Sequence, residues 1–236
     1  MCGRFSLKTT PDTLERIFGH PAPAGYHPRY NVAPSQEVLA IVAEEGAERP
    51  AMLRWGLIPF WAKDPSIGNK LVNARAESIA EKPAFRNAFR KRRCLILADG
   101  FYEWQQRRDG KHPMWVHRPD GEPFALAGLW ERWDRGEHPV ETCTILTTDA
   151  NPFMRTIHTR MPIILGAEAG RAWLDAGASE EALQDLLTGP GEVELEAHEV
   201  SLMVNNPAND RPECIEPMES EESLVSLTEP AREAVS

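Results

Sequence analysis

The sequence lacks the features of membrane and secreted proteins. No apolar run approaches the roughly 20 residues that a membrane-spanning helix requires. The N-terminal segment does not fit a secretory signal peptide, because Asp12, Glu15 and Arg16 interrupt the apolar stretch that such a signal needs. We therefore expect a cytoplasmic protein that does not associate with membranes.

Cysteine is also scarce, and the spacing of its four positions argues against a metal centre. Cys2, Cys94, Cys143 and Cys214 lie far apart, form no C-x-x-C pair and have no histidine cluster beside them at zinc-site spacing. A reducing compartment keeps all four as thiols. We expect no metal and no cofactor. Cys94 and Cys143 stand within the apolar runs RCLIL and TCTIL, which predicts that both are core residues.

Acidic residues outnumber basic ones, and the formal net charge of −10 by itself argues against a nucleic-acid partner. The two signs are unevenly distributed, however. Residues 1–118 hold 19 Lys and Arg against 12 Asp and Glu, whereas residues 119–236 hold 7 against 24. A basic first half can present a positive surface while the acidic second half faces away. Ordinary solvated surface charge explains the same pattern.

Most of the patterned segments are predicted to be strands, rich in β-branched and aromatic residues. They are VLAIVA (38–43), MLRWGLIP (52–59), CLILADGFYEW (94–104, with a turn at Asp99-Gly100), MWVHR (114–118), FALAGLWERW (124–133), CTILTT (143–148), MPIIL (161–165) and LEAHEVS (195–201). The total is about eight strands without regular βαβ alternation. We therefore predict a single α+β domain with a curved, barrel-like, mixed or antiparallel β-sheet core and short peripheral helices.

The predicted helices are short. Thr10-Pro11-Asp12 is typical of a helix start, with a capping hydroxyl, a proline and an acid in the first turn, and Gly19 ends that helix. Residues 73–93 are predicted to be mostly helical with a break at Pro83, and residues 170–176 and 179–187 to be short helices. The polar, acidic residues 219–236 are predicted to form a disordered tail behind a domain that spans residues 2–218.

Cys2 follows the initiator methionine, and two roles are open to it. Removal of Met1, which the small cysteine side chain favours, leaves a free α-amine and a thiol on one residue. Such groups have pKa values near 8 and 8.5, so both are partly nucleophilic at neutral pH. A 1,2-aminothiol condenses with an aldehyde to an imine, and its sulfur then closes a thiazolidine ring. Alternatively, Cys2 is a buried strand residue without chemistry.

Glu103 and His158 are candidate acid–base residues. Glu103 stands between two aromatic residues in GFYEW, and burial there raises a carboxyl pKa toward the range useful for proton transfer. The alternative is a strand residue that points to solvent. His158 is a candidate because histidine as a residue type exchanges protons near neutral pH, although a single loop histidine often has no role. Arg160 in the same IHTRMP segment can bind phosphate. No role is assigned to the other six histidines: His20, His27, His112, His117, His138 and His198.

Other segments offer polar and aromatic groups for a ligand. Asn73 in LVNARAES either caps a helix or aims its amide at a ligand, and Arg75 can contact a phosphate. Trp55 and Trp61 in WGLIPFW are core residues or, where exposed beside arginines, platforms for base stacking. The cationic residues of FRNAFRKRR (85–93) fit phosphate contacts or a solvated helix end.

Seven motifs, taken together and in this order, resemble one family. MCGRF, RYNVAPS, RWGLIPFWAKD, LVNARAES, LADGFYEW, TIHTRMPIIL and VNNPANDRPECIEP are similar to segments of the SOS-response-associated peptidase (SRAP) family. The resemblance runs from Cys2 to about Pro217. It implies abasic-site processing, in which the N-terminal cysteine forms a covalent crosslink to an abasic site in single-stranded DNA.

The resemblance also implies four catalytic residues. Cys2 matches the crosslinking residue, Asn73 the asparagine of the NAR motif, Glu103 the glutamate of the GFYEW segment and His158 the histidine before the MP strand. In such a site Glu103 shuttles protons, His158 protonates the sugar oxygen as the ring opens, and Asn73 orients the adduct. The reaction is lyase-like and needs neither a metal nor an organic cofactor.

The implied partner is single-stranded DNA that contains abasic sites, including sites at junctions with duplex DNA. Arg4, Arg75 and Arg160 match DNA-contacting arginines, and Trp61 matches an aromatic residue at the junction. Some members carry a Trp pair there, whereas here Ala62 follows Trp61. The crosslink shields the lesion during the DNA damage response. Nothing in the sequence indicates an assembly larger than a monomer.

Two other functions are open. One is a cysteine peptidase or amidohydrolase of the N-terminal-nucleophile type, which could use the same Cys2, Glu103 and His158. The word peptidase in the family name refers to such an activity. A non-enzymatic alternative is a module that recognises DNA junctions without bonding to them. The arginines and tryptophans near the site are unnecessary for peptide hydrolysis, which favours a DNA substrate.

Overall fold

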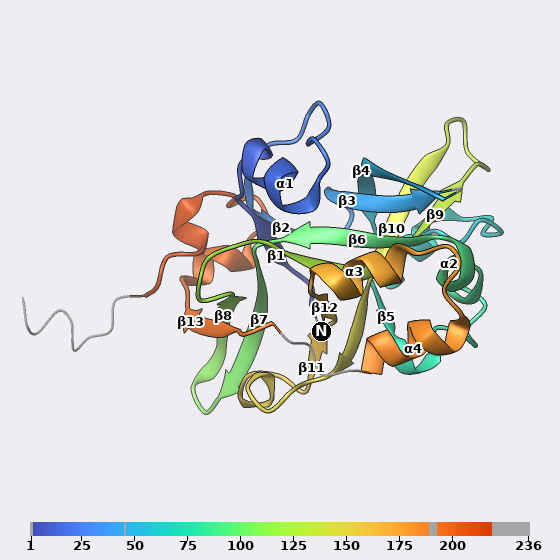
Figure 1. Cartoon of the computed structure of the whole chain (residues 1–236). Coiled ribbons are helices and arrows are strands. Elements are labelled where there is room, and N and C mark those ends of the chain that lie inside the picture. The colour runs from blue at the N-terminus through green and yellow to red at the C-terminus, as the bar shows by residue number, and fades with distance from the viewer. Residues whose placement is uncertain (1, 45, 189–192, 219–236) are drawn as a thin grey trace, which may run out of the picture.

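The computed structural model describes residues 2–44, 46–188 and 193–218, so the tail predicted at 219–236 lies outside the described residues. Its architecture is α+β, as predicted, with two β-sheets and short helices around them (Figure 1). The first sheet has the strand order β13-β8-β7-β1-β2. Its strands are β1 (Phe5–Leu7), β2 (Arg29–Val32), β7 (Gly100–Arg107), β8 (Gly110–His117) and β13 (Glu196–Glu199).

The second sheet is larger and has the order β11-β10-β4-β3-β6-β9-β12, with β5 beside β10. Its strands are β3 (Glu37–Glu44), β4 (Ala47–Trp55), β5 (Asn73–Arg75), β6 (Arg93–Ala98), β9 (Phe124–Trp133), β10 (Val140–Asp149), β11 (Arg160–Pro162) and β12 (Ile164–Leu165). Because β9 also pairs with β10, five strands close into a ring. The pairings are antiparallel apart from those of β10 with β4 and with β5, which are parallel. This ring confirms the predicted curved, mixed sheet.

Three of the predicted helices are present. The helix α1 (Pro11–Phe18) begins where the Oγ1 of Thr10 accepts a hydrogen bond from the N–H of Thr13. It ends at Gly19, whose φ of 76° lies in the left-handed region that glycine adopts at little cost. The helices α3 (Ala167–Leu174) and α4 (Glu180–Thr188) lie within a few residues of the two predicted C-terminal helices.

The prediction of a mostly helical segment at 73–93 is wrong in its first part. Asn73–Arg75 forms strand β5, and only a short 3-10 helix (Ala76–Ser78) and α2 (Arg86–Lys91) follow. The parallel partner β10 satisfies the backbone of β5, which local helix propensity does not anticipate. The count of about eight strands was also too low. The described residues contain thirteen, and several of these have only two to four residues.

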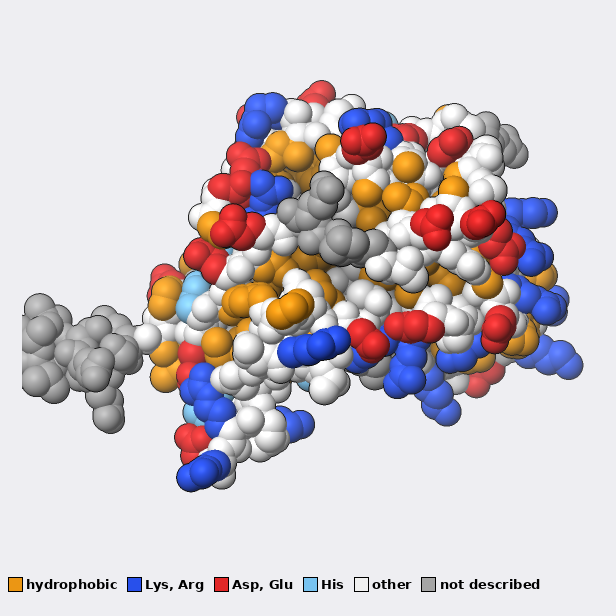
Figure 2. Space-filling view, turned by 60° about the horizontal axis from the view of Figure 1, so that its bottom comes forward, with side chains coloured by type: hydrophobic (Ala, Val, Ile, Leu, Met, Phe, Trp, Pro, Cys, Tyr) orange, Lys and Arg blue, Asp and Glu red, His pale blue; other side chains and the backbone are white. Residues whose placement is uncertain are grey.

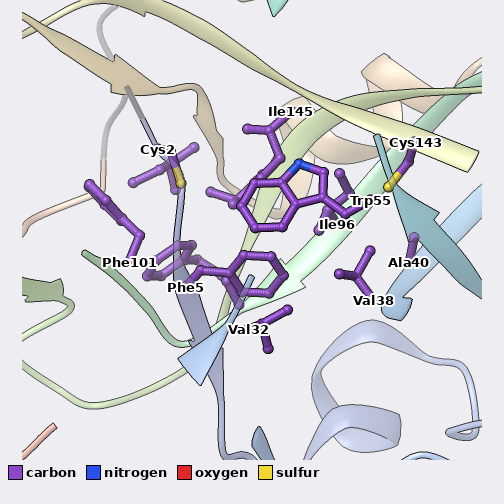
Figure 3. Packing of buried hydrophobic residues seen from close by; sticks show 14 of the residues in the cluster. Cys2, Phe5, Val32, Val38, Ala40, Trp55, Ile96, Phe101, Cys143 and Ile145 are labelled. Atoms are coloured by element: carbon purple, nitrogen blue, oxygen red, sulfur yellow. The ribbon is translucent and has the colours of Figure 1, made fainter. Parts of the chain in front are cut away.

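The hydrophobic core lies between the two sheets and beneath the helices. One cluster joins Cys2, Phe5 and Trp55 with side chains from β6, β9 and β10 (Figure 3). The rings of Phe5 and Trp55 are 5.2 Å apart and tilted by 56°, within the range that aromatic pairs favour. Cys94 and Cys143 are buried, which confirms their assignment to the core.

The surface mixes charges of both signs. On the face drawn in Figure 2, Lys and Arg side chains gather along the right-hand edge, and Asp and Glu side chains stand among them and across the face. The two signs are therefore intermixed on this side of the molecule. Among the described helices, none combines the length and the apolar character that crossing a membrane requires.

Candidate functional site

Cys2 lies inside the molecule, directly before β1. Its side chain is fully buried and packs in the same cluster as Phe5 and Phe101 (Figure 3). The segment is held by β7, because Phe5 lies opposite Phe101 and the N–H of Tyr102 donates to the carbonyl oxygen of Arg4 at 2.9 Å. Cys2 is therefore buried, as expected if it were a structural core residue without a catalytic function. It lies before strand β1 and is not part of that strand.

Asn73 connects β5 to the N-terminal segment. Its Nδ2 donates a hydrogen bond of 2.7 Å to the carbonyl oxygen of Cys2. The parallel register, in which Asn73 lies opposite Ile145 of β10, sets the position of this amide. Its Oδ1 is buried and accepts no hydrogen bond from the described residues. The helix-capping alternative is wrong, because the short helix that follows begins at Ala76 with Arg75 as its cap residue.

Glu103 is buried on the inner face of β7. Side chains alternate along a strand, so Glu103 shares a face with Phe101 and points away from the face of Trp104. It is only 2% exposed, which excludes the solvent-facing alternative. Burial raises the pKa of the Cys2 thiol well above its usual range, and the negative charge of Glu103 raises it further. The thiol is therefore protonated at neutral pH.

His158 lies in the turn that leads into β11. Its Nδ1 faces the backbone of Arg160, whose N–H donates at 3.0 Å and whose carbonyl oxygen lies 3.2 Å away. In a neutral imidazole that accepts at Nδ1, the proton sits on Nε2, and His158 can donate from that nitrogen. The neighbouring Ile157 packs in the same core cluster as Cys2.

The guanidinium of Arg160 is occupied by protein groups. It forms a two-pronged ion pair with Glu77, at 2.7 and 3.0 Å, and a further ion pair of 2.7 Å with Asp149. The carbonyl oxygen of Thr147 accepts another hydrogen bond. A phosphate can therefore reach this guanidinium only in exchange for a carboxylate. Asp149 is the easier one to displace, because its side chain is 78% exposed.

Arg75 and Arg4 differ in how far they are engaged. Arg75 is exposed and makes no hydrogen bond or ion pair with the described residues. Arg4 is partly buried, and its Nη1 donates to the Oδ1 of Asn31 at 2.8 Å and to the carbonyl oxygen of Val204 at 2.7 Å. Arg4 thereby fastens the segment that carries Cys2 to the C-terminal VNNPAND motif.

Two neighbouring aromatic side chains are exposed in the turn after β4. Phe60 is 46% exposed and Trp61 is 42% exposed, although large apolar side chains are usually buried. Trp55 and Ala62, in contrast, are buried. The exposed pair is thus Phe60-Trp61. The two tryptophans of WGLIPFW do not by themselves predict that Phe60 is exposed. A better signal in the sequence is the pair of consecutive aromatic residues, Phe60 and Trp61, directly after Pro59.

The basic run at 85–93 ends in a structural residue. Arg93 is buried, and its guanidinium donates to four carbonyl oxygens at 2.6 to 3.0 Å, those of Phe89, Arg90, Trp173 and Asp175. These carbonyls belong to the C-terminal ends of α2 and α3, so Arg93 caps both helices. A phosphate contact is therefore not the role of Arg93.

Two groups near Cys2 suit acid–base chemistry and positioning: the buried carboxylate of Glu103, whose charge acts on the thiol, and the amide of Asn73. The imidazole of His158 belongs to the turn before β11, next to Ile157 of the same core cluster. Among residues 2–44, 46–188 and 193–218, no group of three or more His, Cys, Asp or Glu side chains is arranged to hold a metal ion.

Comparisons with known proteins identify the family of this chain. The family model for SOS response associated peptidase (SRAP) matches residues 1–207. The abasic site processing protein YoqW of Bacillus subtilis (strain 168) is 47% identical over 223 residues, which cover 92% of this chain and 99% of that relative. The abasic site processing protein HMCES of Gallus gallus is 35% identical over 266 residues, which cover 93% of this chain and 78% of that relative.

A solved structure repeats the fold. The crystal structure of a protein from Bacteroides thetaiotaomicron matches with a TM-score of 0.82 at 25% sequence identity, covering 92% of this chain and 100% of that chain. Both kinds of comparison extend over most of the residues that form the two sheets. The chain therefore belongs to the SOS response associated peptidase (SRAP) family.

Proposed function

We propose that this protein recognises abasic sites in single-stranded DNA and captures them covalently through Cys2 once Met1 has been removed. The observation that carries the proposal is the setting of residue 2: Asn73 holds its carbonyl oxygen, and the charge of the buried Glu103 acts on its thiol. The relatives named as abasic site processing proteins support the same substrate. Capture takes place in the cytoplasm, on chromosomal DNA, and shields the lesion during the DNA damage response.

The proposed reaction joins an aldehyde to an aminothiol with loss of one water. Ring opening of the abasic sugar exposes its C1 aldehyde, and the α-amine of Cys2 adds to that carbon. Loss of water leaves an imine, and the sulfur attacks the same carbon to close a thiazolidine ring. The electron pair of the C=N bond moves to nitrogen, which takes up the proton that leaves the thiol. Because burial keeps the thiol protonated, the amine is the first nucleophile.

Three side chains supply proton transfer and orientation in this scheme. Glu103 takes a proton from the amine as it adds and returns one to the departing water. His158, whose neutral form carries its proton on Nε2, protonates the sugar oxygen as the ring opens. Asn73 orients the adduct, because its Nδ2 already holds residue 2 and its Oδ1 is an unused acceptor among the described residues.

Three arginines hold the DNA backbone in the proposal. Arg75 is available for a phosphate without displacing any described side chain. Arg160 reaches a phosphate by exchanging Asp149 for it. Arg4 bonds to described residues only through Nη1, which leaves its Nη2 for the strand next to the lesion. These contacts would bring the C1 carbon to residue 2 at reactive distance.

In this proposal, the exposed Phe60 and Trp61 make the protein prefer junctions between single-stranded and duplex DNA. An aromatic pair at the surface can stack on the base pair at which single-stranded and duplex DNA meet. Such stacking is worth ~1–3 kcal/mol per base and tolerates any sequence, since every base has a flat face. The protein would act as a monomer, with one site per chain.

The alternative function is that of a cysteine peptidase of the N-terminal-nucleophile type, which is consistent with the word peptidase in the description of the family. The exposed Arg75 and the exposed Phe60-Trp61 pair are unnecessary for peptide hydrolysis but suit a nucleic acid, and they favour the DNA substrate.

The test incubates the protein with an abasic single-stranded oligonucleotide and, separately, with peptide substrates. We expect an adduct that survives heating in denaturant with abasic DNA, none with an oligonucleotide that has all its bases, and no peptide turnover. Cys2→Ala keeps its α-amine and can form only a reversible imine, so its adduct should not survive heating. Peptide turnover without an adduct would support the peptidase. Tight DNA binding without an adduct would support a non-covalent binding module.

A further inference from the structure

His117 and His198 come together on one face of the first sheet, although they are 81 positions apart in the chain. Strands β8 and β13 are antiparallel, with His117 opposite Glu196 and Trp115 opposite His198. Because alternate residues of a strand share a face, these four side chains lie on the same side of the sheet. The two histidines are therefore diagonal neighbours, and the ring of His117 stacks on Trp115 with centroids 4.1 Å apart.

Backbone carbonyls determine the tautomer of both rings. The Nδ1 of His117 lies 2.8 Å from the carbonyl oxygen of Arg118, and the Nε2 of His198 lies 2.8 Å from that of Ile215. A carbonyl oxygen can only accept, so each of these nitrogens carries the proton of its neutral ring. The other two nitrogens, Nε2 of His117 and Nδ1 of His198, then present lone pairs. They face one another at 3.4 Å.

Two lone pairs at this separation repel one another, and a proton or a metal ion placed between the two nitrogens relieves that repulsion. A proton in that place charges one of the two rings, whereas a metal ion leaves both rings neutral. A metal ion fits the spacing, because two nitrogens bound to Zn²⁺ at ~2.0–2.1 Å with a tetrahedral angle are about 3.4 Å apart. Metal-binding histidines also commonly donate their second ring N–H to a carbonyl, as both rings do here.

We propose that His117 and His198 bind a divalent transition-metal ion of the Zn²⁺ class between β8 and β13. The Oε1 of Glu196 lies 3.5 Å from the Nε2 of His117 and contributes negative charge. No three-ligand group is arranged for a metal within the described residues, so the protein supplies two imidazoles and water completes the coordination. The nearby cation Lys8 opposes the ion and keeps its affinity moderate, whereas the guanidinium of Arg118 is paired with Asp120.

Such an ion would tie β13, the last strand of the first sheet, to β8. The residues that follow β13 run back to the N-terminal segment, where the carbonyl oxygen of Val204 accepts a hydrogen bond from Arg4. The ion would therefore stabilise the part of the fold that holds the N-terminal segment. The inference does not depend on the proposed DNA chemistry, and its test uses no DNA.

The test is isothermal titration of ZnCl₂ into the full chain with Cys2→Ser, since a free aminothiol would itself chelate metals. We expect one Zn²⁺ per chain and no binding of Mg²⁺, which prefers oxygen ligands. His198→Gln should weaken Zn²⁺ binding at least about tenfold. His112→Gln is the matched control: it removes a histidine on the same strand as His117, beside Asp109 and Glu199, and should leave the affinity unchanged.

A spectroscopic measurement covers the case in which a variant does not fold. In the Cys2→Ser chain, Zn²⁺ should shift the NMR resonances of the Nε2 of His117 and the Nδ1 of His198. The proposal is overturned if Zn²⁺ leaves both resonances in place or if binding persists in His198→Gln. It is equally overturned if the two rings share a proton at neutral pH that Zn²⁺ does not displace.

Discussion

The side-chain amide of Asn73 holds the carbonyl oxygen of Cys2 at 2.7 Å, across 71 positions of the chain. Asn73 stands on β5, which is placed by its parallel pairing with β10. The same β10 pairs with β11, which begins two residues after His158. One strand therefore sets the positions of both the amide and the histidine-bearing turn relative to residue 2.

Asn73→Asp tests this relationship. The substitution keeps the shape of the side chain but removes the N–H donor and places a negative charge against a carbonyl oxygen. We expect capture of abasic DNA to slow by about tenfold to a hundredfold, because a lost positioning hydrogen bond costs about 1–3 kcal/mol. Single-turnover gel assays measure the rate. Asn69→Asp, the same change at an exposed position, should react at the parent rate.

Glu103→Gln should slow both formation and reversal of the crosslink while DNA affinity stays near that of the parent. The amide is nearly isosteric with the carboxyl group but cannot shuttle a proton, and general acid–base catalysis typically contributes about 10²–10⁴-fold. Rates of crosslinking and of release at saturating DNA provide the measurement. Glu131→Gln, which alters a second buried carboxylate that pairs with Arg92, is the control. If Glu103→Gln forms and releases the crosslink at the rates of the parent protein, Glu103 does not shuttle protons in this reaction.

Alanine at Phe60 and Trp61 should weaken binding to a single-strand/duplex junction by about tenfold while the protein stays folded. About half of each side chain is covered, and the Nε1 of Trp61 donates to the carbonyl oxygen of Pro83, so the free energy of unfolding should fall by about 1 kcal/mol for each. The loss of base stacking should lower affinity for the junction and leave affinity for plain single-stranded DNA nearly unchanged. Fluorescence anisotropy with the two DNAs and urea denaturation give the two readings. Equal losses on both DNAs would assign the pair a general binding role.

Arg93→Ala should destabilise the protein by about 3 kcal/mol or more, because four carbonyl oxygens at two helix ends lose a charged donor. Arg86→Ala, in the same basic run, is exposed and should change stability by less than about 0.5 kcal/mol. Urea denaturation measures both. A stable Arg93→Ala variant with weakened DNA binding would return this residue to the phosphate-contact role.

Local patterns predicted most of the sheet and the core. Apolar runs such as VLAIVA and RCLIL predict buried strands, since a sheet buried on both faces needs continuous apolar residues. The start of α1 follows from Thr10 and Pro11, whose effects are confined to one turn. Strand β5 could not be predicted in this way, because three residues form a strand there only where β10 lies beside them.

The candidate site depends more strongly on contacts between distant segments. Alternation along GFYEW predicts that Glu103 and Trp104 face opposite ways, but only the packing of the second sheet decides which of them is buried. The ion pairs of Arg160 and the approach of His117 to His198 likewise follow from strand register. No local motif carries that information.

Intact mass spectrometry of the protein without Met1, after mixing with abasic single-stranded DNA, tests the central claim most directly. The account predicts a species with the summed mass of protein and oligonucleotide less one water, stable to heating and absent from Cys2→Ala. An unchanged protein mass after prolonged incubation, or an equally heat-stable adduct with Cys2→Ala, would contradict it.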